Sequence, residues 1–222
     1  MSRHILSLFF LCGLWITAAS AQTNFSRFNF DAGGGFGIGR GDVANFTSTS
    51  YNGVVGGGLN LNRKFGVNAE YMYYNLAFKD SVIQQQALPG AKGHLQSVTL
   101  NGIYTFPLNN RWGVYGIGGF GWYQRSVSAR SEVLTGGFTT PCQPAWIWWG
   151  ITCTNGHGGF VSPTQTLSSR TLDAVGFNFG GGITRRLPFA HHAKLYAEGR
   201  YHRAYHSDVK TIVFPVTIGL RW

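Results

Sequence analysis

The last eleven residues of the chain alternate strictly between large apolar side chains and small or polar ones. The apolar positions are Ile212, Phe214, Val216, Ile218, Leu220 and Trp222. An alternation of period two indicates a β-strand with one apolar face, because successive side chains of a strand point to opposite sides. A membrane-spanning barrel needs such a strand, because its outer face meets lipid while its backbone polar groups are paired within the sheet. The pattern therefore predicts a transmembrane β-barrel.

The first residues of the chain have the parts of a cleaved secretory signal. Arg3 and His4 precede an apolar run from Ile5 to Thr17, and a small-residue segment ends at Ala21. The run is shorter than the roughly 18 residues that a membrane helix requires. We therefore expect a signal peptide over residues 1–21 and one mature domain over residues 22–222, exported through the periplasm.

Composition supports a barrel and argues against nucleic-acid binding. The chain has 32 Gly, 15% aromatic residues and only 12% charged residues, a composition that disfavours helices and a charged exterior. Its formal net charge is +10, but the basic residues are scattered instead of forming one stripe. Many fall in short turns, as Arg63-Lys64 and Arg185-Arg186 do. There they are suited to lipid head-group phosphates, so we expect a membrane partner and no nucleic acid.

Alternating segments recur along the mature chain and predict eight strands. Their approximate ranges are 28–39, 52–61, 65–74, 94–106, 112–126, 172–184, 193–203 and 212–222. The in/out phase of the fifth is ambiguous, because both of its faces carry Gly and aromatic residues. Short connections follow the second, fourth and sixth segments, and longer or more polar ones follow the others. This rhythm predicts an all-β fold: an eight-stranded antiparallel transmembrane β-barrel with short periplasmic turns and longer extracellular loops.

The inward faces of these strands carry charged side chains. Three acids, Asp31, Glu70 and Glu198, share the interior with three bases, Lys194, Arg200 and Arg221. Eight strands leave room only for side chains, and buried charges must be paired or hydrated. We expect a structural salt-bridge plug with Glu70 and Arg200 at mid-height and Asp31 near Arg221. The alternative is a gated polar path for small solutes.

The connection between the fifth and sixth strands, about residues 128–168, is the longest stretch without a strand pattern. A loop of this length is usually functional or disordered. It contains Cys142 and Cys153, for which we predict a disulfide, because surface loops pass through an oxidising compartment. Between them lie Trp146, Trp148 and Trp149. These tryptophans extend the aromatic girdle at the membrane surface, or they form a patch for a partner, glycan or surface.

Four stretches of the chain resemble one family of membrane proteins. They are Phe30-Asp31-Ala32-Gly33-Gly34-Gly35-Phe36-Gly37, Glu70-Tyr71, Tyr196-Ala197-Glu198-Gly199-Arg200-Tyr201-His202, and Pro215-Val216-Thr217-Ile218-Gly219-Leu220-Arg221-Trp222. Together they resemble the outer-membrane β-barrel family related to the membrane domain of outer-membrane protein A. The resemblance implies a location in the outer membrane of a Gram-negative-type cell, with outer-membrane lipid and lipopolysaccharide as partners and a monomeric state. The terminal aromatic strand resembles the signal that the barrel assembly machinery recognises.

Relatives of this kind serve as structural proteins, adhesins, weak pores and surface receptors, and some eight-stranded barrels modify lipid A. We expect a non-enzymatic structural or surface-interaction role through the extracellular loops. A small passive, porin-like channel is the alternative, and a lipid A modifying enzyme is a less favoured one. For the enzyme, Tyr205-His206-Ser207-Asp208 lacks the family's His-x-Ser spacing, so His206 and Ser207 would point to opposite faces of a strand.

Two further patterns predict no site. Gly116-Ile117-Gly118-Gly119-Phe120-Gly121 matches the dinucleotide pattern, but no helix follows it, so we expect these small residues to relieve crowding and no cofactor to bind. His202 and His206 share strand parity, yet no third ligand is spaced with them, so we expect no metal.

Overall fold

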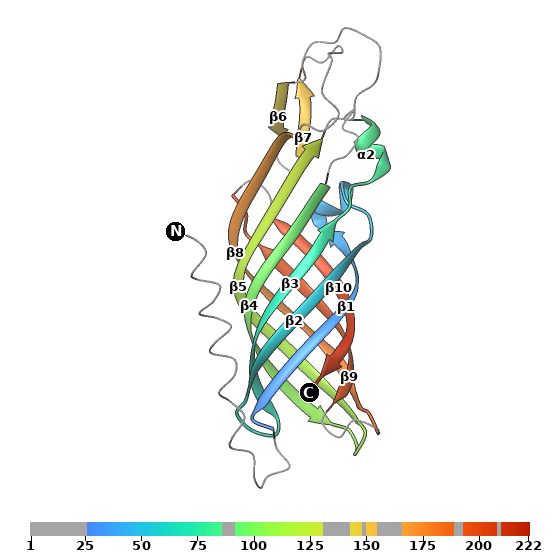
Figure 1. The fold of residues 1–222 in the computed structure, drawn as a ribbon, viewed down its shortest axis with the longest axis vertical. Helices are drawn as coiled ribbons and strands as arrows, with labels where there is room; N and C mark the ends of the chain where they lie inside the picture. The colour runs from blue at the N-terminus through green and yellow to red at the C-terminus, as the bar shows by residue number, and fades with distance from the viewer. Residues whose placement is uncertain are drawn as a thin grey trace.

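Eight strands form a closed antiparallel barrel in the computed structural model (Figure 1), which describes residues 26–85, 92–130, 143–147, 150–154, 166–188, 193–207 and 210–222. The order around the barrel is β1-β10-β9-β8-β5-β4-β3-β2. The strands are β1 (Phe28–Arg40), β2 (Ser50–Asn60), β3 (Phe65–Leu76), β4 (Lys92–Pro107), β5 (Trp112–Arg130), β8 (Thr166–Arg186), β9 (Lys194–Ala204) and β10 (Thr211–Arg221). The predicted fold is confirmed.

The alternation read from the sequence sorts the side chains between lipid and interior. Phe36 and Phe120 are each 68% exposed on the outer face, whereas Asn68 is fully buried inside. Among the last residues, Phe214, Val216, Ile218, Leu220 and Trp222 all face outward. At the closing seam the backbones of Phe30 and Trp222 exchange two hydrogen bonds, of 2.8 and 2.9 Å. The terminal strand therefore completes the barrel, as its pattern indicated.

The β2–β3 and β4–β5 connections are short, whereas the predicted difference in length fails for the last two connections, since residues 187–193 between β8 and β9 outnumber residues 205–210 between β9 and β10. Two short turns use the same device: the side-chain oxygen of Asn62 accepts hydrogen bonds from the backbone of Lys64 and Phe65, and Asn109 accepts them from Arg111 and Trp112, each at 2.8 Å. An Asn side chain that bonds the backbone in this way mimics a backbone turn. The β1–β2, β3–β4 and β5–β8 connections are longer and lie at the opposite end, where Figure 1 shows the additional elements.

Our expectation of an unstructured stretch over residues 128–168 was wrong in part. β5 continues to Arg130 and β8 starts at Thr166, so their ladder is longer than predicted. Between them, β6 (Gln143–Ile147) and β7 (Gly150–Thr154) pair as a separate antiparallel hairpin beyond the ends of β5 and β8 (Figure 1). Outside the membrane both strand faces are wet, so alternation no longer marks a strand there.

Two short helices lie in the first two long connections. They are the 3-10 helix η2 (Gly41–Asn45) and the helix α2 (Asp80–Gln85). No helix within the described ranges is long and apolar enough to cross a membrane.

The structure resolves the phase of β5. Tyr115, Ile117 and Tyr123 point inward and are buried, whereas Phe120 and Trp122 face lipid. Our expectation that the glycines of this strand relieve interior crowding holds only for some. A Cβ at inward-facing Gly119 or Gly121 would collide with the backbone of β4, whereas one at Gly116 would meet nothing within 4 Å.

Candidate functional site in the barrel interior

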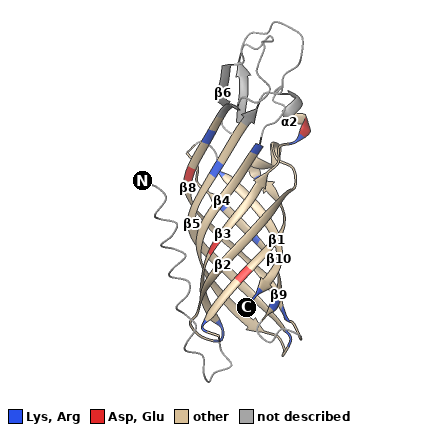
Figure 2. Ribbon diagram, in the orientation of Figure 1, with Lys and Arg blue, Asp and Glu red and all other residues tan. Residues whose placement is uncertain are grey.

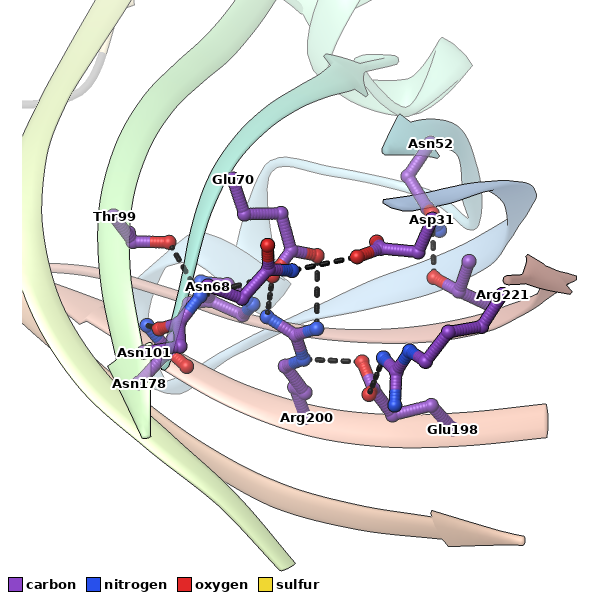
Figure 3. Close-up of polar contacts among 12 residues, drawn as sticks. Asp31, Asn52, Asn68, Glu70, Thr99, Asn101, Asn178, Glu198, Arg200 and Arg221 are labelled. Atoms are coloured by element: carbon purple, nitrogen blue, oxygen red, sulfur yellow. Dashed lines mark hydrogen bonds and ion pairs between the residues drawn. The ribbon is translucent and has the colours of Figure 1, made fainter. Parts of the chain in front are cut away.

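The centre of the barrel holds a buried ion pair between β3 and β9 (Figure 3). Arg200 donates to both carboxylate oxygens of Glu70, with Nη1–Oε2 and Nη2–Oε1 distances of 2.7 and 2.8 Å. Both residues lie in the middle of their strands and are almost fully buried. A two-point contact of this kind fixes the planes of both groups as well as their separation. The pair therefore forms a rigid crosspiece inside the barrel.

Glu198 extends this pair toward the end of the barrel that carries the short turns. One of its oxygens accepts a hydrogen bond from Arg200 Nε, and the other accepts one from the Tyr115 hydroxyl at 2.7 Å. Arg221 lies 3.9 Å from Glu198, and its guanidinium carbon is 4.7 Å from the centroid of the Tyr115 ring. The charges thus alternate in sign along the chain of contacts, which lowers the cost of burying them.

Amide side chains bond the acids from the other side. Asn101 donates to Glu70 at 2.9 Å and accepts a hydrogen bond from Asn178 at 2.9 Å. Asn68 donates to Asp31 at 2.6 Å. The contacts of Asn101 join β4 and β8 to the crosspiece, and the contact of Asn68 joins β3 to β1. Glu70 and Asp31 therefore each accept a hydrogen bond from a buried amide side chain.

Two of the six expected charges stand apart from the ion pairs. Asp31 lies directly opposite Arg221 in the β1–β10 register, but its hydrogen bond is to Asn68. Lys194 is half-buried at the start of β9, away from the crosspiece. The structure thus joins Glu70, Arg200, Glu198 and Arg221 by ion pairs, and Asp31 and Lys194 lie outside these pairs.

A small cavity adjoins the crosspiece. Its volume is about 10 Å³, which is close to the minimum that holds one water molecule. Pro215 lines it together with Glu70 and Arg200. The β9–β10 register skips Phe214 and Pro215, since proline has no N–H to donate to a ladder. The void has room for a water and none for a solute.

An apolar cluster fills the half of the interior nearer the long connections, and sequence reasoning missed it. Its members are Val43, Val54, Met72, Tyr74, Leu76, Leu95, Tyr123, Ala174, Ala204 and Val213, with Phe46 and Phe78 packed against them. Val43 comes from η2, so the first connection folds into the barrel mouth. Val43, Ala44 and Phe46 are the only apolar residues of residues 41–49, too few to form a period that would have identified it.

Hydrogen bonds hold the first connection, residues 41–49, which we call the cap, against the second connection. Ser48 N donates to Ala77 O and Lys79 N donates to Phe46 O, each at 2.9 Å. The Lys79 ammonium also donates to Ala44 O at 2.7 Å.

A second apolar cluster, Ile103, Tyr115, Ile117 and Tyr196, fills the other end of the interior. The crosspiece is therefore enclosed between two apolar layers.

The histidines have separate partners. His202 Nδ1 lies 3.1 Å from the Tyr123 hydroxyl, and His206 Nδ1 lies 3.1 Å from the Thr211 hydroxyl. His206 is buried in the interior whereas Ser207 is exposed, so they do not form the outward-facing pair that a deacylase needs. Within the described ranges, no three His, Cys, Asp or Glu side chains are grouped as for a metal ion.

Several predicted features fall outside the described residues. They include the signal peptide over residues 1–21, Cys142, Trp148 and Trp149. The other two predicted loop residues, Trp146 and Cys153, lie in the β6–β7 hairpin. The backbone of Trp146 pairs with Ile151 and that of Cys153 pairs with Pro144, and only their backbones are described. The disulfide and the tryptophan patch stay predictions.

Comparisons with known proteins agree with this architecture. The family model described as outer membrane protein beta-barrel domain matches residues 8–221. The solved Neisserial surface protein A is similar in structure, with 14% identity, a TM-score of 0.58, and coverage of 88% of this chain and 96% of that one. A major outer membrane protein from Thermus thermophilus has 11% identity and a TM-score of 0.53, covering 88% and 97%.

At such identities the solved structures support the fold alone, and no curated protein sequence matches the chain. The family model spans nearly all of the chain, and the resemblance that four stretches of the sequence suggested is thereby confirmed. The chain belongs to the outer membrane protein β-barrel domain family and is an eight-stranded barrel of the cell outer membrane.

Proposed function

We propose that this protein is a closed, non-enzymatic barrel that acts at the cell surface through the extension of β5 and β8. The observation that carries the proposal is the length of β8. Its pairing with β9 begins at Gly176, so no described strand pairs with residues 166–174 on the side away from β5. We call this segment, its β5 partners and the β6–β7 hairpin the surface arm.

The arm has features of a docking element. Within the described residues no strand lies beside this edge of β8, and a strand edge of this kind can pair with a partner's extended segment. The hairpin beyond it contains the Trp146–Trp149 segment, and tryptophan supplies a large contact area with few rotatable bonds. A short barrel held rigid by its crosspiece is a suitable base for such an arm.

The filled interior supports a non-conducting barrel over the channel alternative. Both apolar layers and the crosspiece would have to move before a solute could pass. The lipid A modifying alternative gains nothing from the contacts of His206. Neither alternative has an observation in its favour within the described residues.

Loop replacement tests the proposal. Residues 127–170 are exchanged for a short turn joining Ser126 to Thr171, which pair across the ladder, so that the hairpin and most of the β8 edge are removed. A matched variant keeps the edge and replaces only residues 131–165 with a Gly/Ser segment of the same length. Nanodisc-embedded protein is applied to a glycan array, and whole cells are assayed for attachment to epithelial monolayers. We expect the short turn to abolish binding and the Gly/Ser segment to weaken it, while heat-modifiable gel migration stays normal in both. Binding that survives both replacements, or steady single-channel conductance of the wild type, would contradict the proposal.

A further inference from the structure

Two arginines flank Ile212 on the outer face of the barrel, at the end that carries the long connections. Arg40 stands opposite Ile212 in the β1–β10 register, and Ile212 stands opposite Arg203 in the β9–β10 register. Directly opposed residues of paired strands lie on the same face of a sheet. The residues on either side of Arg203, His202 and Ala204, are buried in the interior. Because successive side chains of a strand point to opposite sides, both arginines project from the outer face.

The two arginines lie where the apolar outer face ends. Arg40 is the last residue of β1, and Ile212 is the first outward-facing residue of β10, with exposed Phe214 next below it. The Arg203 guanidinium carbon is 5.1 Å from the centroid of the Tyr205 ring, which is itself exposed on the outer face. Tyrosine on a barrel exterior favours the head-group region of the membrane. The arginines are therefore at the extracellular membrane interface.

The described part of the chain does not neutralise these arginines. Most of the barrel wall carries neither acidic nor basic residues (Figure 2), and no described carboxylate forms an ion pair with Arg40 or Arg203. Asp42 follows Arg40 by two residues without pairing with it, and the Arg40 side chain makes no capping hydrogen bond to η2. Lys210, one residue before β10, is exposed and adds a third positive charge. Charges at a membrane are costly unless they are paired, so a counter-charge from outside the chain is expected.

The spacing of the two arginines suits a phosphate group. Their strands are separated by one strand, so their Cα atoms are about 10 Å apart. An arginine side chain extends several ångströms and binds phosphate oxygens through two parallel N–H groups. Both side chains can therefore reach one phosphate that lies over Ile212. Below this position, exposed Phe36 of β1 and Phe214 of β10 provide an apolar surface for acyl chains.

We propose that Arg40 and Arg203 bind a phosphate of lipid A, the phosphorylated glycolipid of lipopolysaccharide, in the outer leaflet. The phosphate accepts hydrogen bonds from both guanidinium groups, and the Lys210 ammonium adds a point charge. The acyl chains run along the outer face of β1 and β10. The position at the extracellular end favours lipid A, because this glycolipid makes up that leaflet of an outer membrane. A free phosphate offers the same anion, but it has no use for the apolar surface below the arginines.

The β2–β3 turn provides a matched control at the opposite end of the barrel. Arg63 and Lys64 are both exposed, as Arg40 is. The turn is held by the side-chain oxygen of Asn62, which accepts hydrogen bonds from the backbone of Lys64 and Phe65. Replacing the Arg63 and Lys64 side chains therefore removes the same charge without touching Arg40 or the turn.

The test compares wild type, the Arg40→Gln/Arg203→Gln variant and the Arg63→Gln/Lys64→Gln variant in phosphatidylcholine nanodiscs. Each receives bis-phosphorylated lipid A, dephosphorylated lipid A with the same acyl chains, phosphatidylglycerol or inorganic phosphate. Native mass spectrometry reports the retained ligand, and the urea midpoint reports the stability that it adds. The Arg40→Gln/Arg203→Gln variant should retain at least about tenfold less bis-phosphorylated lipid A than wild type, which corresponds to about 1.4 kcal/mol. It should also gain little stability from that lipid.

The Arg63→Gln/Lys64→Gln variant should behave as wild type with every ligand. Equal retention of bis-phosphorylated lipid A by the two double variants would overturn the proposal, and so would equal retention of the two forms of lipid A by wild type. Phosphatidylglycerol or inorganic phosphate that stabilises wild type as strongly as lipid A would overturn the glycolipid as the source of the phosphate. Arg40→Gln alone changes an exposed residue at a strand end, so it tests the same direction if the double variant fails to fold.

Discussion

Glu70 and Arg200 lie 130 residues apart in the chain and are joined by two nearly parallel hydrogen bonds across the barrel. Replacing either partner alone leaves the other as a buried, partly compensated charge. The penalty for such a group exceeds the net gain from the intact pair. A single substitution of Glu70 or Arg200 is therefore expected to destabilise the barrel more than removal of both charges together.

Glu70→Ala should destabilise the barrel by about 3 kcal/mol or more, because Arg200 keeps only Glu198 as a counter-charge. The urea midpoint in lipid vesicles measures this. Glu70→Leu combined with Arg200→Leu is the matched control and should cost less, since no charge is left unpaired. If Glu70→Ala conducts ions better without losing stability, the interior is a gated path and not a plug.

Gly119→Ala should cost about 1–3 kcal/mol, in the range of overpacked cores. The added Cβ would collide with the Leu100 carbonyl oxygen on β4. Gly116→Ala in the same strand is the control, because a Cβ there meets nothing within 4 Å. Equal urea midpoints for the two variants would show that the β4–β5 backbones can separate at this point.

Val43→Asp should unfasten the cap at the extracellular mouth. The side chain is fully buried among apolar groups, and an unpaired charge is not tolerated there. Limited proteolysis should cut the β1–β2 connection while the barrel keeps its heat-modifiable migration. Asn45→Asp adds the same charge at an exposed position of η2 and should remain resistant. Resistance of both variants would mean that the cap is held by its backbone bonds alone.

Trp222→Asp, or deletion of Trp222, should lower the yield of protein in the outer membrane and leave chain in the periplasm. The residue is 48% exposed, packs 6.5 Å from the Phe30 ring and belongs to the terminal assembly pattern. Trp222→Phe keeps an aromatic ring and should assemble normally. Fractionation with surface proteolysis checks this; normal yield of the Asp variant would contradict it.

Cys142 and Cys153 should form a disulfide in protein isolated from cells. Mass spectrometry of unreduced peptides should show the linked pair, and free thiols at both positions would reject it. Replacing Trp146, Trp148 and Trp149 with Ser then tests the patch within an intact ring. If this variant binds as wild type does in the assays above, the tryptophans are structural.

The membrane-spanning part of the fold followed from alternation, because lipid on one side and a packed interior on the other sort residues with period two. This logic placed Glu70, Arg200 and Glu198 in the interior. It could not reveal which groups bond, since that depends on the stagger of strands around the barrel: Asp31 meets Asn68 although Arg221 stands opposite it.

Alternation also fails to identify strands outside the membrane, where no lipid face opposes a packed interior. The ends of β5 and β8 and the β6–β7 hairpin lie outside the membrane, so their faces need not differ in polarity. The cap was missed because Val43, Ala44 and Phe46 are the only apolar residues of the first connection, too few to form a period. Its burial is a tertiary fact, visible only once η2 is folded against Leu76 and Val213.

The seam between β1 and β10 has a kinetic consequence. Every other ladder of the barrel joins strands that follow one another along the chain, interrupted only by the β6–β7 insertion between β5 and β8. Those ladders can form as successive hairpins over short loops, but the seam must bring the two ends of the domain together. Its closure entropy is the largest in the molecule. We expect an open, curved sheet to accumulate before the final strand docks, with the time to reach the native state set by that single encounter.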